Sequence, residues 1–522
     1  MMRRHAFFIG LFVIIAVARF MILLTSQTHV HSDEAIIGLM GKHILEGRYF
    51  PFYMYGQPYN AGAAWEAYLA AIAFAVFGVS VIPLKSCILV LSLLCLVLFY
   101  WMCLALYDQR TALLAAIVFA VTPSLLKWHF QVRGYSWYFL SIPILTMLFT
   151  SVASDWARKQ TTLFFFGLAS AVSIWCLELA IPIVAAFWML LILRRKLSLN
   201  NAALAFGGCV LGYLPVVACN LMHHFNNWRY LFVERPGGGF QSLLQLSTYG
   251  RILLDEMPKF FGPDTVLWYY SDKPASGYVF YAIALLAVVT AIWPFVKSPS
   301  KMVGALRGNL ADWRQERDFD MLLLTAASFV PYLTVRPGVP SYFFGGCFFL
   351  SVLTGRMLER SFSYSKALPR LGGAVVLSAI LLTGTVVIVG VGQENQIETL
   401  SSCDEGKSYC MTRIPAVDIE GVEDYLRQHH VTSVWTTISF IYPLLFESGE
   451  TLAVSNAIFE DPYRVYPREI PWREPSADRD AAFIIETVAP FRSGLEMRYA
   501  QAFGTAPFIR EYGKLTVITE HE

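Results

Sequence analysis

Long apolar runs separated by short polar segments fill the first three-quarters of the chain. The first run, Ala6 to Leu24, can cross about 30 Å of hydrocarbon because an α-helix rises about 1.5 Å per residue. It follows a basic N-terminus and lacks a small-residue cleavage site, which predicts a membrane helix instead of a removed signal peptide. Ten further runs lie near residues 86 to 106, 111 to 127, 136 to 153, 161 to 177, 179 to 193, 201 to 219, 278 to 296, 320 to 335, 340 to 358 and 371 to 392. The pattern predicts about eleven membrane-spanning helices.

The run from Ala63 to Phe77 decides the orientation of everything that follows it. Lysine and arginine gather in cytoplasmic loops, and three basic clusters mark such loops here. They are Arg194 to Lys196, Lys297 to Arg317 and Arg356 to Arg370. All three share the N-terminal side if eleven helices span, whereas an extra span at Ala63 to Phe77 would move them to the other side. We therefore expect that run to be an interfacial or re-entrant helix and the N-terminus to be cytoplasmic.

This parity places most of the unusual polar residues on the external face. The external segments would be residues 26 to 85, 127 to 135, 220 to 277, 336 to 340 and everything after 391. From residue 393 to 522 the apolar runs stop, and strand-like stretches at 432 to 437, 452 to 455 and 481 to 485 alternate with helical ones. We predict a multi-pass protein of the inner (plasma) membrane, mostly α over 1 to 392, with an external soluble α/β domain over 393 to 522.

Composition agrees with a lipid-facing surface. Hydrophobic residues make up 56% of the 522 residues and charged ones 15%, and the mean hydropathy is +0.51. The net charge is only +2 and the cations form no basic stripe, so we do not expect nucleic acid as a partner. Cys403 and Cys410 stand in a polar stretch, where a disulfide and two free thiols are both open alternatives.

The first external loop carries adjacent carboxylates, Asp33 and Glu34, about nine residues after the first helix. Ionisable groups held this close to a bilayer usually face a cavity and mark a functional site. One interpretation is a general base, which needs a carboxylate whose pKa is set by burial and neighbours. The other is the start of a helix capped by Ser32, where acids favour the helix dipole. The residues alone do not decide between the two.

Other candidates lie in the following external segments. Glu66 has only aromatic, alanine and isoleucine neighbours, which favours a functional role, whereas Glu178 at a turn between spans is an ordinary interfacial carboxylate. Arg133 stands among aromatic residues in KWHFQVRGYSW, and a guanidinium can bind a phosphate bidentately. Arg336 offers the same chemistry, with snorkelling to lipid headgroups as the alternative for both arginines. The histidines show no metal-ligand spacing, so we predict no metal site.

These motifs together resemble a known group of enzymes. The pair DE early in the loop, then HILEG, then YGQPY, then a small-residue helix with a glutamate is similar to the C-type (GT-C fold) glycosyltransferase superfamily. The bacterial family-39-like members are the most similar, together with protein O-mannosyltransferases and the lipid A aminoarabinose transferase. The resemblance covers roughly residues 6 to 180 well and the remainder only in layout. It implies a multi-spanning enzyme whose donor is a polyprenyl-phosphate sugar.

The resemblance also implies roles for individual residues. Asp33 would be the base that deprotonates the acceptor while the sugar is transferred with inversion, and Glu34 would orient or bind substrate. The second external loop lacks the aspartate of many members and has an Arg-x-Tyr pattern instead, which assigns Arg133 and Tyr135 to the donor side. Further substrate-binding residues would be Tyr55, Gln57, Tyr59, Glu66 and Arg336. No cofactor is required, although a divalent metal remains possible.

The expected activity is therefore transfer of a hexose or pentose from a polyprenyl-phosphate donor to a lipid, glycan or protein acceptor on the external face. Two other functions stay open. A transporter or flippase of lipid-linked sugars would also place polar residues in a membrane bundle, although the odd helix count, the absence of a visible repeat and the terminal domain argue against it. A non-catalytic assembly subunit is compatible with the missing carboxylate of the second loop.

Overall fold

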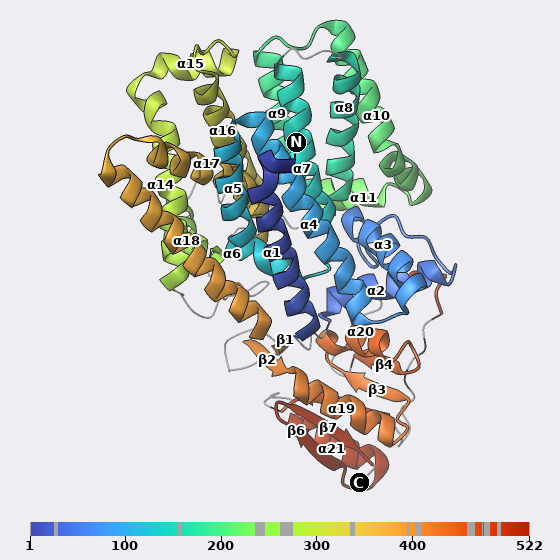
Figure 1. Cartoon of the computed structure of the whole chain (residues 1–522). Coiled ribbons are helices and arrows are strands. Elements are labelled where there is room, and N and C mark those ends of the chain that lie inside the picture. The colour runs from blue at the N-terminus through green and yellow to red at the C-terminus, as the bar shows by residue number, and fades with distance from the viewer. Residues whose placement is uncertain are drawn as a thin grey trace.

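The computed structural model describes residues 2–25, 30–154, 159–234, 246–261, 275–334, 340–393, 396–401, 410–456, 465–471, 473, 475, 481–487 and 492–520. A bundle of long helices forms most of the molecule, and a small domain with a β-sheet lies at one end of it (Figure 1). The N-terminal end of helix α1 lies toward the opposite end of the bundle (Figure 1). The protein is thus a helical membrane protein with a C-terminal α/β domain.

All eleven predicted apolar runs are helical. The corresponding helices are α1 (Met2–Thr25), α4 (Val81–Leu106), α5 (Gln109–Val121), α7 (Ser136–Ala153), α8 (Lys159–Cys176), α9 (Ile181–Leu193), α10 (Leu199–Met222), α14 (Ala275–Lys297), α16 (Trp313–Thr334), α17 (Phe344–Ser363) and α18 (Ala367–Gln393). Within the described residues, six helices are long and apolar enough to cross a membrane. Four shorter apolar helices, one of them α3 (Ala61–Phe77), are not among the six. The number of spans, eleven, stays a prediction.

Short helical segments connect the long ones. These are α6 (Pro123–Trp128), η1 (Glu178–Ala180), α11 (Asn226–Arg229), η2 (Tyr230–Glu234), α12 (Leu246–Arg251), η4 (Ile252–Glu256), α13 (Met257–Phe260), α15 (Pro299–Arg307) and η5 (Pro340–Phe343). The predicted run 111 to 127 is divided into α5 and α6 because Thr122 has an extended backbone, with ψ of 117°. Thr122 precedes Pro123, and the proline ring disfavours the helical conformation of the residue before it.

The predicted basic clusters meet at the end of the bundle that carries α15. Arg194 pairs with Asp320, and Arg317 approaches the same carboxylate at 3.4 Å. Arg360 pairs with Asp318, which is 1% exposed. Figure 1 shows α15 and the N-terminus near this end, away from the α/β domain. The clusters therefore share one side of the bundle, as their sequence pattern predicted, and several of their arginines hold helices together.

The C-terminal domain contains two sheets. Strands β1 (Gln396–Ser401) and β2 (Cys410–Pro415) form an antiparallel pair, and five strands form a sheet of order β4-β3-β5-β7-β6. The five are β3 (Ser433–Thr436), β4 (Ala453–Asn456), β5 (Ala481–Glu486), β6 (Phe508–Tyr512) and β7 (Leu515–Thr519). Its helices are α19 (Ala416–Gln428), α20 (Ile438–Glu447) and α21 (Arg492–Phe503). The three predicted strands are confirmed as β3, β4 and β5.

Two helices fill the space between the bundle and the α/β domain. They are α2 (Ser32–Leu45) and α3, of which α2 lies directly beside α20 of the C-terminal domain (Figure 1) and α3 contacts α20 through Phe74 and Phe446. Their connecting loop and the start of α7 come together with them at this end of the bundle. Asp33 and Glu34 lie on α2, Glu66 lies on α3, and Arg133 lies in the loop directly before α7.

Candidate active site

The first turn of α2 is capped by a residue that the sequence analysis did not assign to it. His31 is the N-cap: its imidazole Nδ1 accepts a hydrogen bond from the Asp33 N–H at 3.3 Å. Glu34 completes a capping box by accepting from the His31 N–H at 2.9 Å. The expected cap at Ser32 is therefore wrong by one residue, because a glutamate three positions after His31 favours that register. The cap bonds that the structure describes do not use the Asp33 carboxylate.

Glu34 holds three parts of the chain together. Its carboxylate accepts a hydrogen bond from the Val132 N–H at 3.0 Å and lies 3.4 Å from the Lys85 ammonium. Glu34 is 2% exposed and Lys85 is 6% exposed. Such a buried ion pair needs additional hydrogen bonds to offset the desolvation of both charges, and the two backbone N–H groups supply them. Glu34 thereby fixes α2 to α4 and to the loop that precedes α7.

Glu66 holds the same loop from the other side. Its two oxygens accept hydrogen bonds from Gly134 N–H at 2.7 Å and Ser136 N–H at 3.0 Å. Asn60, the left-handed N-cap of α3, donates to the Arg133 carbonyl at 3.4 Å. Glu66 lies on α3, a helix that we place outside the membrane spans. Burial raises the pKa of its carboxyl to about 7, whereas the hydrogen bonds from these N–H groups lower it.

The loop approaches α3 so closely that glycine is required at the contact. A Cβ at Gly62 would lie 2.0 Å from the Gly134 carbonyl oxygen. Gly134 itself has a φ of +81°, a left-handed conformation that other residues rarely adopt. The backbone before and after Arg133 is therefore fixed by Glu34, Asn60 and Glu66.

Asp33 and Arg133 face one another in a small cavity. The Arg133 Nη1 donates to the Asp33 Oδ2 at 3.2 Å, and the side chain of Asp33 is 35% exposed while that of Arg133 is 3% exposed. The cavity has a volume of about 90 Å³. Its lining consists of Asp33, Met54, Gln57, Tyr59, Asn60, Arg133, Tyr135, Leu177, Glu178, Leu179 and Tyr342. A carboxylate that can accept a proton thus lies beside a cation that can stabilise developing negative charge.

A second cavity adjoins the first. It has a volume of about 390 Å³, and both cavities are lined by Met54 and Gln57. The α2–α3 loop, α10, α11 and the segment Val465 to Arg468 of the C-terminal domain form its walls. Four tyrosines and three asparagines are among its lining residues, and such side chains can contact a ligand that combines a flat face with hydroxyl groups.

The predicted residues fall into three groups. Asp33, Gln57, Tyr59, Arg133 and Tyr135 line the small cavity, and Tyr59 also stacks on Tyr230. Glu34 and Glu66, predicted to bind substrate, are enclosed and engage the backbone of the Arg133 loop. Tyr55 lines the second cavity and contacts His43, and Arg336 lies outside the described residues. Cys403 and the side chain of Cys410 also lie outside them.

Sequence analysis missed several residues at this site. Lys85 begins an apolar run, where a lysine usually marks only the membrane interface, and the fold alone brings it to Glu34. Glu178, interpreted as an ordinary interfacial carboxylate, lines the small cavity. Tyr342 reaches the cavity from η5, more than 300 positions after Asp33. Within the described part of the chain, no three His, Cys, Asp or Glu side chains form a group that could hold a metal ion.

Comparison with solved structures identifies the fold. ArnT from Cupriavidus metallidurans aligns over 98% of this chain and 98% of its own, with 12% identity and a TM-score of 0.56 in the apo state. Its structure bound to undecaprenyl phosphate gives 11% identity, the same coverages and a TM-score of 0.55. The archaeal oligosaccharyltransferase AglB from Archaeoglobus fulgidus, in complex with an inhibitory peptide and a dolichol-phosphate, aligns over 88% of this chain and 65% of its own, with 11% identity and a TM-score of 0.50.

These neighbours show that the chain has the GT-C fold, as its sequence motifs predicted. No protein-family model matches the sequence, and no curated protein matches it either. Both the bundle and the C-terminal domain take part in the alignment with ArnT, because it covers almost the whole length of each chain.

Proposed function

We propose that this protein is a membrane glycosyltransferase that moves a sugar from a polyprenyl-phosphate donor to an acceptor hydroxyl or amine, with Asp33 as general base. The observation that carries the proposal is the contact between the Asp33 carboxylate and the Arg133 guanidinium in a cavity at one end of a GT-C bundle. A transfer from a lipid phosphate needs a proton acceptor and a fixed cation a few ångströms apart. The likeness to ArnT bound to undecaprenyl phosphate supports a lipid-phosphate donor.

The chemistry balances without a cofactor. The acceptor oxygen or nitrogen forms a bond to the anomeric carbon and gives its proton to Asp33. The bond between that carbon and the phosphate oxygen breaks, and its electron pair stays on the polyprenyl phosphate. Arg133 stabilises the charge that develops on the leaving phosphate. Attack from the face opposite the phosphate inverts the configuration at the anomeric carbon.

The second cavity supports a separate entrance for the acceptor. It meets the small cavity at Met54 and Gln57, and the C-terminal domain forms part of its wall. An acceptor held there would reach Asp33 while the donor lipid remains among the helices. We propose that the acceptor is a lipid, glycan or protein that enters from the side of the C-terminal domain.

The opposite end of the bundle favours an enzyme over a transporter. A transporter with alternating access would open at that end, but ion pairs with the buried carboxylates of Asp318 and Asp320 join α9, α16 and α17 there. Asp320 is fully buried between Arg194 and Arg317. Separating the partners of a buried ion pair leaves uncompensated charges and costs about 3–5 kcal/mol.

The proposed orientation has the N-terminus in the cytoplasm and the C-terminal domain outside. A reporter enzyme that is active only outside the cytoplasm, fused near residue 520, should give signal. The same fusion after α15, which shares the end of the bundle with the N-terminus, should be silent (Figure 1). A silent fusion near 520 with an active one after α15 would reverse the proposed orientation.

A deletion strain tests the function directly. Without the protein, the lipid-linked sugar donor should accumulate, and one modified glycan, lipid or protein should lose a sugar in mass analysis of the cell envelope. Restoring the wild-type gene should reverse both changes, whereas a gene encoding Asp33→Asn should reverse neither. Unchanged lipid-linked sugars and unchanged envelope components in the deletion strain would contradict the proposal.

A further inference from the structure

Helix α2 carries charged residues at both of its ends. Asp33 and Glu34 stand in its first turn, and Lys42 and His43 stand in its last. The rise of an α-helix places residues 33 and 43 about 15 Å apart along the axis. A displacement of the last turn therefore moves the first turn with it, because the helix between them is a rigid element.

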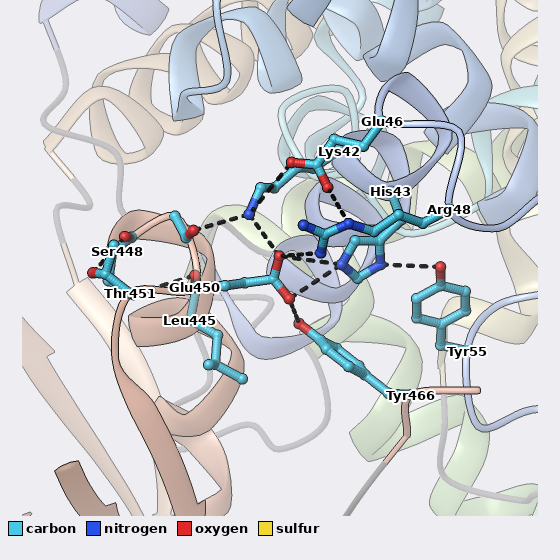
Figure 2. Close-up of polar contacts among 11 residues, drawn as sticks. Lys42, His43, Glu46, Arg48, Tyr55, Leu445, Ser448, Glu450, Thr451 and Tyr466 are labelled. Carbon is cyan, nitrogen blue, oxygen red and sulfur yellow. Dashed lines mark hydrogen bonds and ion pairs between the residues drawn. The ribbon is translucent and has the colours of Figure 1, made fainter. Parts of the chain in front are cut away.

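The last turn of α2 is bound by one carboxylate of the C-terminal domain. Figure 2 shows Glu450 pointing at this turn, with its oxygens between Lys42 and His43. The Lys42 Nζ lies 2.6 Å from Glu450 Oε2 and also donates to the Gly449 carbonyl at 2.9 Å. The His43 Nε2 lies 3.1 Å from Glu450 Oε1. The same carboxylate thus contacts two successive residues of α2.

Two tyrosines extend this contact into the wall of the second cavity. The Tyr466 hydroxyl donates to Glu450 Oε1 at 3.0 Å, and the Tyr55 hydroxyl lies 3.2 Å from His43 Nδ1 (Figure 2). His43 is fully buried, so its two ring nitrogens depend on these partners for their hydrogen bonds. Tyr55 belongs to the α2–α3 loop and Tyr466 to the C-terminal domain, and both line the second cavity.

The backbone around Glu450 is held in an uncommon conformation. Gly449 has a φ of +62° and Glu450 a φ of +65°, so a non-glycine residue occupies the left-handed region between α20 and β4. Such a conformation persists where surrounding contacts enforce it. This turn ends α20, with the Glu450 N–H donating to the Leu445 carbonyl at 2.8 Å, and the Glu450 side chain extends from it to α2.

Burial and hydrogen bonding keep Glu450 charged. Burial alone would raise its pKa, but the hydrogen bonds from His43 and Lys42 and their charges outweigh it and lower the pKa to about 2. The carboxylate therefore remains ionised at any physiological pH. Arg48, at 3.7 Å, adds a further cation to the group.

Packing next to this contact leaves α2 no room to move toward α20. A Cβ at Gly38 would lie 2.5 Å from the ring of Phe446, which also contacts Phe74 of α3. Gly38 lies between the two charged ends of α2. The helix is thus pressed against α20 at its middle, tied to Glu450 at its last turn, and tied to Val132 through Glu34 at its first turn.

We propose that Glu450 is a positioning residue for glycosyl transfer: by holding Lys42 and His43, it sets the position of α2 and with it the contact between Asp33 and Arg133. The inference rests on the proposed function for its consequence in catalysis, but not for its effect on the helix. It also gives the C-terminal domain a task in the reaction beyond forming a wall of the second cavity. Loss of the Glu450 contact would therefore loosen the position of α2 and the wall of the second cavity at the same time.

Hydrogen–deuterium exchange of the full-length protein in lipid nanodiscs tests the helix directly. Glu450→Gln keeps the size of the side chain and removes its charge. We expect several-fold faster exchange at the last turn of α2 and also in the peptide 131 to 136, whose Val132 N–H bonds to Glu34 at the far end of the helix. The matched control is Asp424→Asn, which alters an exposed ion pair with Arg427 in the same domain and should change neither peptide.

A second variant covers the case in which Glu450→Gln does not fold. Lys42→Gln removes the Lys42–Glu450 ion pair from the α2 side and should accelerate exchange in the same two peptides. The effect of the double variant should be smaller than the sum of the two single effects, because both single variants lose the same Lys42–Glu450 ion pair. Exchange that rises only next to Glu450 and leaves 131 to 136 unchanged in the folded variants would overturn the proposal.

Turnover separates positioning from simple loss of stability. With a synthetic polyprenyl-phosphate sugar, kcat per donor-binding site should fall by between about tenfold and a hundredfold, since a misplacement of about 1 Å can cost 10²-fold. The KM for the donor should stay within about twofold. A variant with fewer folded molecules would instead lose donor-binding sites and keep its kcat per site. If the wild type transfers no sugar, the proposed function fails while the exchange measurement still decides the role of Glu450.

Discussion

Asp33 and Arg133, one hundred residues apart in the sequence, form an ion pair of 3.2 Å that closes one side of the small cavity. Three other groups prepare this contact. The capping box of His31 and Glu34 starts α2 at the right residue, and Glu66 and Asn60 hold the loop on which Arg133 stands. The pair therefore depends on the packing of α2, α3 and α4 against the loop that precedes α7.

Replacing Arg133 should weaken the handling of the donor phosphate. In Arg133→Lys an ammonium replaces the planar guanidinium and cannot bind a phosphate bidentately. The activity of this variant should therefore be lower than that of the wild type. Arg133→Ala should raise the dissociation constant of a polyprenyl phosphate in a direct binding assay. Arg229→Lys, in an exposed pair with Glu234, serves as a control and should bind the lipid normally. Equal lipid affinity in wild type and Arg133→Ala would remove Arg133 from the donor site.

Glu66 should affect the reaction through the loop and not through contact with substrate. Glu66→Gln places an amide N–H₂ beside the Gly134 or Ser136 N–H, so that at least one buried donor loses its acceptor, at a cost of about 1–3 kcal/mol. We expect a lower melting temperature and a lower turnover together. Glu420→Gln, an exposed position on α19, should change neither quantity. A variant with normal stability and no activity would instead favour direct substrate contact by Glu66.

The contact made by Glu450 should contribute stability that depends on pH in the acid range. A carboxyl whose folded-state pKa is lowered to about 2 stabilises the fold fully above its ordinary value of 4.5 and loses that contribution as the pH falls toward 2. The side chains that contact it, Lys42, His43, Arg48 and Tyr466, are not carboxylic acids. The difference in melting temperature between wild type and Glu450→Gln should therefore shrink between pH 4.5 and pH 3. A difference of equal size at pH 5 and pH 3 would contradict this assignment.

The helical part of the fold was largely predictable because long apolar runs give a strong signal. All eleven runs are helices, and the boundary of the bundle at α18 agrees with the loss of apolar runs near residue 393. The five-stranded sheet was predicted less completely. Its strand β6 has a mostly exposed face and gives no apolar pattern, and β7 is apolar without alternation, so neither has the period-two signature of a half-buried strand.

The candidate site was predictable as a set of residues but not as an arrangement. Asp33 and Arg133 were found because ionisable groups are unusual near a membrane, yet no local pattern indicates that they touch. Lys85 and Glu66 show this limit of the sequence most clearly. In the sequence, Lys85 resembles a lysine at the membrane interface and Glu66 resembles a residue that binds substrate. Their partners, Glu34 and the Gly134 backbone, become visible only when distant helices pack together. The histidine of the HILEG motif is a similar case, because its partner Glu450 is about 400 positions away.

The proposed catalytic role of Asp33 rests on a difference between an acid and its amide. Asp33→Asn keeps the shape of the side chain and can still contact Arg133, but it cannot accept the proton of the acceptor. The capping box does not use this carboxylate, so the fold and the melting temperature should stay close to those of the wild type.

The most direct measurement is the rate of sugar transfer by purified wild-type and Asp33→Asn protein from a synthetic polyprenyl-phosphate sugar to acceptors in envelope extracts of the deletion strain. General-base loss should lower the rate by roughly 10²-fold or more while donor affinity stays unchanged. Equal rates for the two proteins would contradict the account, leave Asp33 as a structural residue of α2, and return the function to a transporter or an assembly subunit.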